Sequence, residues 1–478
     1  MSTFDNYIGG NWTGAAKTAA NINPSNTTDI IGEYAQADAA QTAEALENAT
    51  SAFAAWSNSG IQQRFDVLDN IGTELLARKA ELGQLLSREE GKTLAEGMGE
   101  AARAGQIFKY FAGEVLRMSG DSIASTRPGI EVEVSREPLG VIGVITPWNF
   151  PIAIPAWKIA PALAYGNCVL FKPASLVPGS AWALSEIISR SGLPDGVFQL
   201  LMGSGSVVGK SLLEDKRVRG VSFTGSVATG GIVASSCSAR GAKFQLEMGG
   251  KNPLVVLNDA NLDTALACAI NGAFFSTGQR CTASSRMIVE AGVYDQFADA
   301  MIKATRDLKV GDALDEATQM GPVVDQSQLD QDLDYIKIGR DEGADLAVGG
   351  ERLSLDQEGF YLSPALFVDT QNDMRINQEE IFGPVATLIK VADEDEAIAM
   401  ANDTPFGLSA GICTQSLGAA SRFKRQSQAG MVMINLPTAG VDYHVPFGGT
   451  KGSSYGAREQ GSYAAEFYTT VKTTYIQP

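Results

Sequence analysis

The first third of the chain has the apolar spacing of amphipathic helices. Apolar residues recur at helical intervals in 39–56, 62–90 and 97–117, and the breakers SNSG and GKTL separate these segments. We therefore predict three helices before residue 118. Residues 130–137 (IEVEVSRE) alternate between apolar and polar side chains instead, which predicts an exposed antiparallel strand.

Beyond residue 140 the pattern changes to short apolar runs that alternate with helical segments. The first series comprises VIGVIT, CVLFKP, VFQLL, VRGVSFTG and KFQLEM, and the second comprises PLVVLN, RMIVE, ATLIKV, LSAGICT and MVMIN. This alternation is typical of βαβ units and predicts an α/β fold with largely parallel, doubly wound sheets. The C-terminal run FYTTVKTTYIQP is again β-rich, and we expect it to form a small sheet with residues 130–137.

Composition narrows the possible functions. The chain has 37 basic and 55 acidic residues, a net charge of −18, which argues against nucleic acid as a partner. No apolar run approaches the roughly 18 residues needed to span a bilayer, and the N-terminus has no secretory signal. Five scattered cysteines without CxxC spacing favour a cytoplasmic protein with free thiols and argue against structural zinc. Because His444 is the single histidine, a catalytic base is to be sought among carboxylates and lysines.

The carboxyl ends of the first strand series are candidates for a nucleotide site. Ligands bind at this edge of an open parallel sheet, where the N–H groups of the following helices attract phosphate. The strand ends carry TPWNFP, FKPAS, GSGSVVG and FTGSVATG, without the GxGxxG fingerprint. Lys172 could reach a phosphate or a ribose hydroxyl there, and the alternative is a solvated strand end. GSGSVVG, with Gly205 and Gly209, is explained equally well as an ordinary turn before a helix.

Cys281 and Glu247 are the candidates for covalent chemistry. Cys281 lies in a small polar loop, GQRCTASSR, directly after Arg280. An adjacent cation and loop amides would favour the thiolate, which is the reactive form of cysteine. The alternative is a buried structural cysteine, a description that suits Cys168 and Cys268. Glu247 ends an apolar strand and is followed by two glycines in LEMGGKNP.

Seven motifs together resemble one family. TPWNFP, FKPAS, FTGS, LEMGGKNP, GQRC, EEIFGP and PFGG occur in the order and spacing of the aldehyde dehydrogenase superfamily, and the resemblance spans nearly the whole chain. It implies that family's fold: a variant Rossmann cofactor domain, an α/β catalytic domain and a small β oligomerisation domain. We expect NAD(P) to bind within 1–122 and 140–246, catalysis within 247–440, and oligomerisation through 123–139 and 460–478. The oligomer would be a homodimer or a homotetramer.

The resemblance also implies roles for single residues. Cys281 would attack the aldehyde, and Asn149, with the Cys281 N–H, would stabilise the oxyanion. After hydride transfer to the nicotinamide, Glu247 would activate the water that hydrolyses the thioester and would help to deprotonate the thiol. Lys158 resembles a lysine of the active-site proton path, and no metal is expected. The cofactor shell would comprise Thr146, Trp148, Lys172, Ser175, Gly205, Gly209, Gly225, Ser226, Met248, Glu380 and Phe382. Without the motif, Glu380 would be taken for a surface carboxylate at a helix end.

Ser175 bears on the choice of cofactor. NAD-preferring members of the family often have Glu at this position, in KPAE, where the carboxylate binds the adenosine ribose. A carboxylate would repel a 2′-phosphate, whereas Ser175 and Lys172 could accept one. We therefore predict that NADP is tolerated, and we leave open whether NADP or NAD is preferred.

The substrate is expected to be an aldehyde with a distal carboxylate. The loop NLPTAGVDYHVPFGG most resembles α-ketoglutaric semialdehyde dehydrogenases, with succinate semialdehyde dehydrogenases as the alternative. The latter typically have Arg where this chain has Trp157. Arg103 and Arg280 are the candidate carboxylate ligands. The alternatives are an ordinary ion pair for Arg103 and support of the Cys281 loop for Arg280. His444 is expected to shape the substrate entrance.

Two other functions stay open. A CoA-acylating dehydrogenase would pass the same thioester to CoA, but such members usually lack the base that Glu247 would supply. A non-catalytic protein on this fold would be expected to lack the set of Asn149, Glu247 and Cys281, which is intact here.

Overall fold

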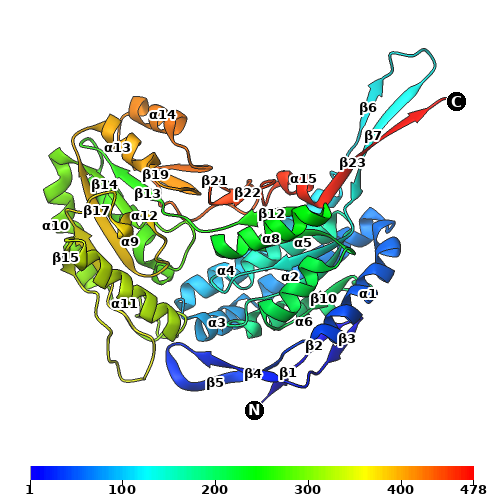
Figure 1. Ribbon diagram of the computed structural model, residues 1–478, viewed down its shortest axis with the longest axis horizontal. Coiled ribbons are helices and arrows are strands. Elements are labelled where there is room, and N and C mark those ends of the chain that lie inside the picture. The colour runs from blue at the N-terminus through cyan, green and yellow to red at the C-terminus, as the bar shows by residue number, and fades with distance from the viewer. Residues whose placement is uncertain (1) are drawn as a thin grey trace.

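Four helices precede the predicted strand series in the computed structural model, which describes residues 2–478 (Figure 1). They are α1 (Ala39–Ser57), α2 (Ile61–Ala77), α3 (Lys79–Glu90) and α4 (Leu94–Val115). The single helix predicted over 62–90 is therefore wrong, because Arg78 (φ −96°, ψ 12°) leaves the helical conformation and divides it. Thr93 begins α4 with a capping box, in which its hydroxyl and backbone N–H both bond to Glu96.

The first large sheet contains the predicted strand series. Its parallel strands are β8 (Val141–Ile145), β9 (Cys168–Lys172), β10 (Phe198–Leu200), β11 (Val218–Thr224) and β12 (Lys243–Glu247). They lie in the order β12-β11-β8-β9-β10, so the chain reverses its direction of winding between β8 and β11. Such a switch point opens a crevice at the carboxyl ends of the two strands.

Helices connect these strands, as predicted. They are α5 (Ala153–Ala164), α6 (Pro178–Ser189), α7 (Lys210–Glu214) and α8 (Val227–Arg240). The helix expected from Gly205 begins as a π turn over Gly205–Gly209, and only then continues as α7.

Short strands at both edges extend the first sheet and were not predicted. β2 (Asn6–Ile8) and β3 (Asn11–Thr13) add beside β10, and β22 (Ser454–Tyr455) adds beside β12. A separate N-terminal sheet has the order β1-β5-β4, from β1 (Thr3–Phe4), β4 (Thr18–Asn23) and β5 (Asn26–Ala35). These strands are short or mostly polar, so their apolar pattern is weak.

The second large sheet has the order β15-β16-β17-β14-β13-β19-β20, and only β15 is antiparallel to its neighbour. The strands are β13 (Pro253–Val256), β14 (Arg286–Glu290), β15 (Asp345–Val348), β16 (Ala365–Val368), β17 (Val385–Val391), β19 (Ser409–Cys413) and β20 (Met431–Ile434). The helices of this half are α9 (Leu262–Phe274), α10 (Ala291–Asp307), α11 (Gln326–Asp341), α12 (Arg375–Gln378), α13 (Glu394–Asn402) and α14 (Leu417–Gln426). A two-stranded sheet pairs β18 (Phe406–Gly407) with β21 (Thr450–Lys451).

A three-stranded arm projects from the body of the molecule (Figure 1). It contains β6 (Asp121–Ala124), β7 (Glu131–Pro138) and β23 (Thr469–Ile476), all antiparallel, and α15 (Ala465–Tyr468) leads into its last strand. The strand predicted over 130–137 and its pairing with the C-terminal run are confirmed. We propose the domain ranges predicted above as the division of this chain.

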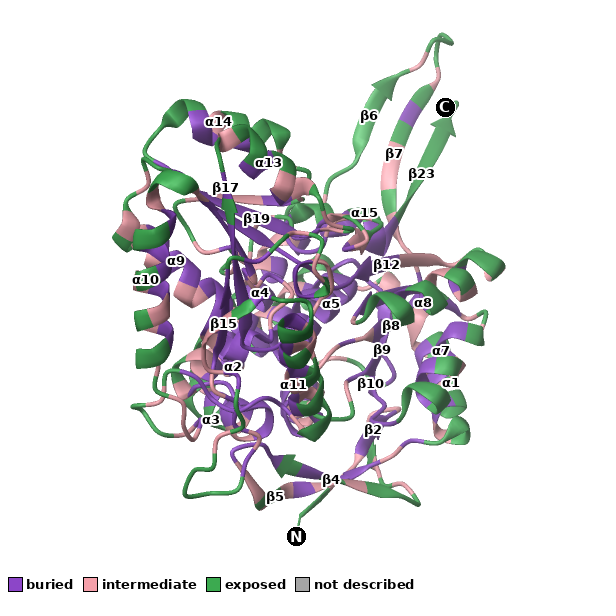
Figure 2. Ribbon diagram, turned by 60° about the vertical axis from the view of Figure 1, so that its left-hand side comes forward, coloured by how far each residue is buried: buried purple, intermediate pink, exposed green. Residues whose placement is uncertain are grey.

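The core is formed by the two large sheets and the helices that cover them. Figure 2 shows their strands mostly buried, whereas much of the arm and the outer helix faces are exposed. Among residues 2–478, no helix combines the length and apolar character needed to cross a membrane. In the same range, no cluster of three or more His, Cys, Asp or Glu side chains is arranged to hold a metal ion.

Candidate active site

Two cavities meet at Cys281. The first, which we call the Arg103 cavity, has a volume of about 320 Å³. The second, the Glu380 cavity, is of the same size and opens at the switch point between β8 and β11. Cys281 lines both cavities, so two different ligands could reach its sulfur from two sides.

The environment of Cys281 disfavours the thiolate in this structure. Burial, followed by the negative charges of Glu380 and Glu247, raises the pKa of Cys281 to about 12. Backbone N–H groups at Cys281 and Thr282 act in the opposite direction, but they are weaker. The loop amides thus act in the predicted direction, but burial and the two carboxylates outweigh them. The Arg280 guanidinium donates to the carbonyls of Asn271 and Gly272, at the end of α9.

The loop before Cys281 has an unusual backbone. Ser276, Thr277 and Gly278 are three consecutive residues with positive φ, at 51°, 56° and 67°. A Ser or Thr residue in the left-handed backbone conformation costs roughly 1–3 kcal/mol, and it persists only where neighbouring groups hold it. Glu96 provides such a contact, since its Oε1 accepts the N–H of Ser276 at 2.7 Å and its hydroxyl at 3.2 Å.

Asn149 lies in the loop between β8 and α5 and lines the Glu380 cavity with Cys281. Its Nδ2 donates to the carbonyl of Gln279 at 3.0 Å, which ties the amide to the nucleophile loop. An amide nitrogen has two hydrogens, so one donor is left for a ligand. The structure thus brings Asn149 and Cys281 to the same cavity.

Glu247 is buried at the end of β12, where its Oε2 accepts a hydrogen bond of 2.5 Å from Ser454. Burial and then the carboxylate of Glu459 raise the pKa of Glu247 well above its ordinary value, and the Ser454 hydrogen bond opposes this. Glu459 also forms a buried ion pair with Lys158. In the described chain no hydrogen bond joins Glu247 to Cys281, and Glu247 does not line either cavity.

Sequence reasoning missed Ser454 and Glu459. Neither lies in a motif that indicates chemistry. Ser454 is 207 positions from its partner Glu247, and Glu459 is 301 positions from its partner Lys158. One signal was present: Lys158 is the only charged residue in the apolar helix AIPAWKIAPALA. A lysine buried at such a position requires an acceptor or a carboxylate partner.

The Glu380 cavity brings together many of the predicted cofactor residues. Its lining includes Trp148, Gly225, Ser226, Met248, Glu380 and Phe382. The Trp148 and Phe382 rings meet edge to face at 5.4 Å, and Phe382 has a φ of +66°. Glu380 lies against Gly249, where a Cβ would come within 2.0 Å of its Oε2. Burial raises the pKa of Glu380 to about 7, so it is not a surface carboxylate.

This lining fits a nicotinamide riboside. Trp148 and Phe382 offer aromatic surface for a ring, and Glu380 is an acceptor for hydroxyl groups. Thr224 also lines the cavity, and its buried hydroxyl oxygen has no hydrogen-bond partner among the described residues. Buried polar atoms are normally paired, so an unpaired hydroxyl beside a cavity is in line with a ligand site.

The other predicted cofactor residues lie at the carboxyl edge of the same sheet but outside the Glu380 cavity. They are Thr146, Lys172, Ser175, Gly205 and Gly209. The alternative of a solvated strand end for Lys172 is wrong, because its side chain is buried and Nζ donates to the Pro173 carbonyl at 2.9 Å. Burial lowers the pKa of Lys172 to about 8. Ser175 is exposed and makes one long hydrogen bond, of 3.4 Å, to Gly203.

The Arg103 cavity combines apolar walls with a half-buried cation. Arg103 lies 5.9 Å from the Trp157 ring, which stacks on Phe447 at 5.4 Å. The Arg103 Nη2 donates to the side-chain oxygen of Gln460 at 3.3 Å, and the Arg103 Nε has no partner among the described residues. Arg280 also lines this cavity, but its guanidinium bonds to the α9 carbonyls. His444 is exposed and does not line either cavity, so its expected place at the entrance is not supported.

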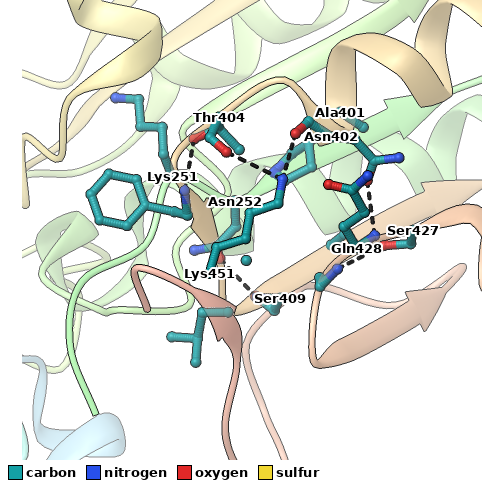
Figure 3. A pocket seen from close by; sticks show the side chains of 15 residues that line it. Lys251, Asn252, Ala401, Asn402, Thr404, Ser409, Ser427, Gln428 and Lys451 are labelled. Carbon is teal, nitrogen blue, oxygen red and sulfur yellow. Dashed lines mark hydrogen bonds between the residues drawn. The ribbon is translucent and has the colours of Figure 1, made fainter. Parts of the chain in front are cut away.

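A third, narrow cavity lies in the second half of the molecule, away from Cys281 (Figure 3). Lys451 extends into it and donates to the carbonyls of Asn402 at 2.6 Å and Thr404 at 3.2 Å. Its volume of about 10 Å³ leaves room for no more than a water molecule. The candidate site therefore consists of the two cavities at Cys281.

The fold and this site define a thiol-dependent oxidoreductase, in which a cysteine lies between a nucleotide crevice and an apolar substrate cavity. The chain belongs to the aldehyde dehydrogenase family, whose model matches residues 12–474. The predicted family, its fold and NAD(P)-dependent aldehyde oxidation are thereby confirmed.

Curated relatives and solved structures agree with this assignment. The chain is 44% identical to alpha-ketoglutaric semialdehyde dehydrogenase of Bacillus subtilis, over 100% of this chain and 99% of the relative. It is 42% identical to alpha-ketoglutarate semialdehyde dehydrogenase of Haloferax volcanii, over 98% of each chain. Betaine aldehyde dehydrogenase from Staphylococcus aureus, solved in complex with NAD+, superposes with a TM-score of 0.96 at 33% identity, covering 99% of this chain and 95% of that one.

Proposed function

We propose that this enzyme oxidises α-ketoglutaric semialdehyde to 2-oxoglutarate with NADP or NAD, through a thioester on Cys281. The observation that carries the proposal is the position of Cys281 on both cavities. An aldehyde in the Arg103 cavity and a nicotinamide in the Glu380 cavity would meet at opposite sides of one sulfur. The two relatives named for this semialdehyde are similar to the chain over its whole length, which supports the same substrate here.

The first half of the reaction forms a covalent adduct. The Cys281 sulfur attacks the aldehyde carbon while its proton passes to a base, for which Glu247 is the candidate. The second N–H of the Asn149 amide and the Cys281 backbone N–H then donate to the oxyanion. Trp148, Phe382 and Glu380 would hold a nicotinamide riboside, which would supply the hydride acceptor for this carbon, and the product on Cys281 would be a thioester.

The second half of the reaction releases the acid. Glu247 removes a proton from water, the resulting hydroxide adds to the thioester carbon, and the carbon–sulfur bond breaks to give the carboxylate and a free thiol. The raised pKa of Glu247 makes its carboxylate a stronger base than that of an ordinary glutamate. Lys158 and Glu459, which form an ion pair beside Ser222, are placed to move the proton away from Glu247.

Arg103 is the proposed ligand of the distal substrate carboxylate. Its side chain is half-buried, it lines the same cavity as Cys281, and its buried Nε has no partner among the described residues. Arg280 is the weaker candidate because its Nη2 already donates to two backbone carbonyls, although its Nε, like that of Arg103, has no partner among the described residues. Succinate semialdehyde also has a distal carboxylate and is the alternative substrate.

The decisive experiment compares kcat/KM for α-ketoglutaric semialdehyde, succinate semialdehyde and an uncharged aldehyde of similar length, each with NAD and with NADP. We expect the first substrate to give the highest value with either cofactor. A preference for the uncharged aldehyde would contradict the proposal. Adding CoA tests the acylating alternative, since appearance of an acyl-CoA in place of the free acid would establish that function instead.

The arm is the proposed contact between subunits of a homodimer or homotetramer. Its sheet has no helix covering it, and Ile123, Val471 and Tyr475 are 52%, 63% and 61% exposed. Apolar side chains exposed in such a cluster are typical of an interface. Light scattering of wild type and of Val471→Asp, which places a charge on this sheet, tests the assignment, because an unchanged oligomer would contradict it. The free cysteines are in line with a cytoplasmic enzyme.

A further inference from the structure

A buried cluster at the junction of α3 and α4 lies directly behind the Asn149 loop. Its members are Glu90, Lys92 and Glu100, whose side chains are 0% exposed. Lys92 Nζ lies 2.5 Å from Glu100 Oε2 and 3.6 Å from Glu90 Oε2. Burial lowers the pKa of Lys92, but these carboxylates outweigh it and the net shift is upward, so Lys92 is a cation at neutral pH.

Lys92 also contacts the loop that carries the proposed oxyanion donor. Its Nζ donates to the backbone carbonyl of Asn149 at 2.8 Å and lies 4.0 Å from the centre of the Phe150 ring. The carbonyl of Asn149 thus has a charged donor, and charge-assisted hydrogen bonds are the stronger and more geometrically demanding kind. The side-chain amide of the same residue donates to the carbonyl of Gln279.

Glu100 fixes the other end of this loop. Its Oε1 accepts the N–H groups of Ile152 at 2.9 Å and Ala153 at 3.0 Å, where α5 begins. One carboxylate therefore binds Lys92 through Oε2 and caps α5 through Oε1. The segment from Asn149 to Ala153 is held at both ends by one ion pair.

We infer that Lys92 and Glu100 are positioning residues for the oxyanion site, because together they set where the Asn149 amide lies relative to Cys281. The same helix reaches the nucleophile loop, since Glu96, one turn before Glu100, bonds to Ser276 at 2.7 Å. The first turns of α4 thus contact both segments whose relative position determines the oxyanion site. Lys92 lines neither cavity at Cys281. Glu100 belongs to the wall of the Arg103 cavity, but its side chain is 0% exposed and its oxygens bond to Lys92, Ile152 and Ala153, so a direct role with substrate is not part of this inference.

A double-mutant cycle tests the inference, which rests on the oxyanion role proposed for Asn149. Asn149→Ala should lower kcat/KM by about 100- to 1000-fold, as loss of an oxyanion donor does. Lys92→Met should lower kcat by about 10- to 100-fold with little change in KM, since it misplaces a donor that acts on the transition state. In the Asn149→Ala background, Lys92→Met should cost less than about threefold, because the donor it positions is already absent.

Two further variants separate positioning from general stability. Lys109→Met removes a lysine that lies within α4 and pairs with Asp69 at 2.6 Å, away from the site, and it should keep activity within about twofold. Glu100→Gln keeps an acceptor for the α5 amides but removes the charge beside Lys92, and should show the same loss confined to kcat. It replaces Lys92→Met in the cycle if that variant does not fold. Lys92→Arg, which retains a cationic donor, should recover part of the activity.

The outcomes are distinct. The positioning role would be overturned if Lys92→Met, or Glu100→Gln in its place, lowered kcat by the same factor with and without the Asn149 amide. An unchanged kcat in either variant would overturn it as well. Full activity of Asn149→Ala would remove the oxyanion role itself and so contradict the proposed function.

Discussion

Ser454 donates a hydrogen bond of 2.5 Å to Glu247, although the two residues lie 207 positions apart in the chain. The serine belongs to β22, which pairs with β12 at the edge of the first sheet and so comes next to the residue that ends it. Burial and Glu459 favour the protonated carboxyl, whereas this hydrogen bond favours the carboxylate. The balance of these effects sets the pH range in which Glu247 can act as a base.

Ser454→Ala should move the acidic limb of the kcat profile to higher pH. A general base works in its deprotonated form, so activity rises as pH passes its pKa. Removing a donor to the carboxylate destabilises the charged form, and the raised pKa of Glu247 rises further. Steady-state kcat measured from pH 5 to 10 would detect the shift. Ser462→Ala, at an exposed serine, is the control, and a shift of the Ser454 variant toward lower pH would contradict the prediction.

Glu247→Gln should separate the two halves of the reaction. A glutamine cannot take the proton from water, so the thioester should accumulate after about one equivalent of NAD(P)H per site, and turnover should fall about 100- to 10,000-fold. Stopped-flow absorbance would show the burst, and mass spectrometry of quenched enzyme would show the acyl adduct. If the burst slows by as much as turnover does, the carboxylate acts on Cys281 and not on water. Glu466→Gln, at an exposed glutamate, should behave as wild type.

The strongly patterned parts of the fold could be predicted from the sequence. Each strand from Val141 to Glu247 is a short apolar run, and these runs were located to within a residue or two. The N-terminal strands Thr3–Ala35 could not be found, because they are short, mostly polar and paired with distant segments. The break in the helix at Arg78 could not be predicted either, because arginine is a good helix former. The ion pairs of its guanidinium with Glu74, Glu81 and Glu186 form only in the folded chain.

Motifs located the candidate reacting groups but not the groups around them. Cys281 and Asn149 come from loops that a family resemblance identifies, and the fold brings both to one cavity. The ionisation of Cys281 could not be deduced from its neighbour Arg280, because adjacency in sequence does not determine where a guanidinium points. Lys92 was overlooked for the same reason, since its partners Glu100 and Asn149 become neighbours only through the packing of α4 against α5.

Cys281 should be alkylated slowly at neutral pH and ever faster as pH rises. With a pKa raised to about 12, only a small fraction is thiolate near pH 8, and the rate should keep increasing beyond pH 10 without a plateau near the ordinary value. Peptide mapping after iodoacetamide treatment would report all five cysteines, and Cys168, buried in β9, is the internal control. A plateau below pH 9 would show that the thiolate is stabilised in solution.

Ser175→Glu should shift the cofactor preference of the enzyme toward NAD. The side chain is exposed at the carboxyl edge of the cofactor sheet, two residues beyond the Lys172–Pro173 strand end. A carboxylate there would repel a 2′-phosphate, so the ratio of kcat/KM for NADP over NAD should fall at least tenfold, about 1.4 kcal/mol. Ser175→Gln has the same size without the charge and should change the ratio much less. Equal effects of the two variants would exclude an electrostatic cause.

Arg103→Met should weaken binding of carboxylated aldehydes selectively. Methionine preserves packing against Trp157 but removes a charge-assisted hydrogen bond, worth about 1.5–3 kcal/mol, so KM for α-ketoglutaric semialdehyde should rise about 10- to 150-fold. KM for an uncharged aldehyde of similar length should stay within about threefold, because its chain meets only the apolar wall formed by Trp157 and Phe447. Arg117→Met, at an exposed arginine just beyond α4, controls for loss of positive charge. An equal rise in KM for both substrates would contradict the assignment of Arg103 and would leave Arg280, despite its two carbonyl partners, as the cation to test next.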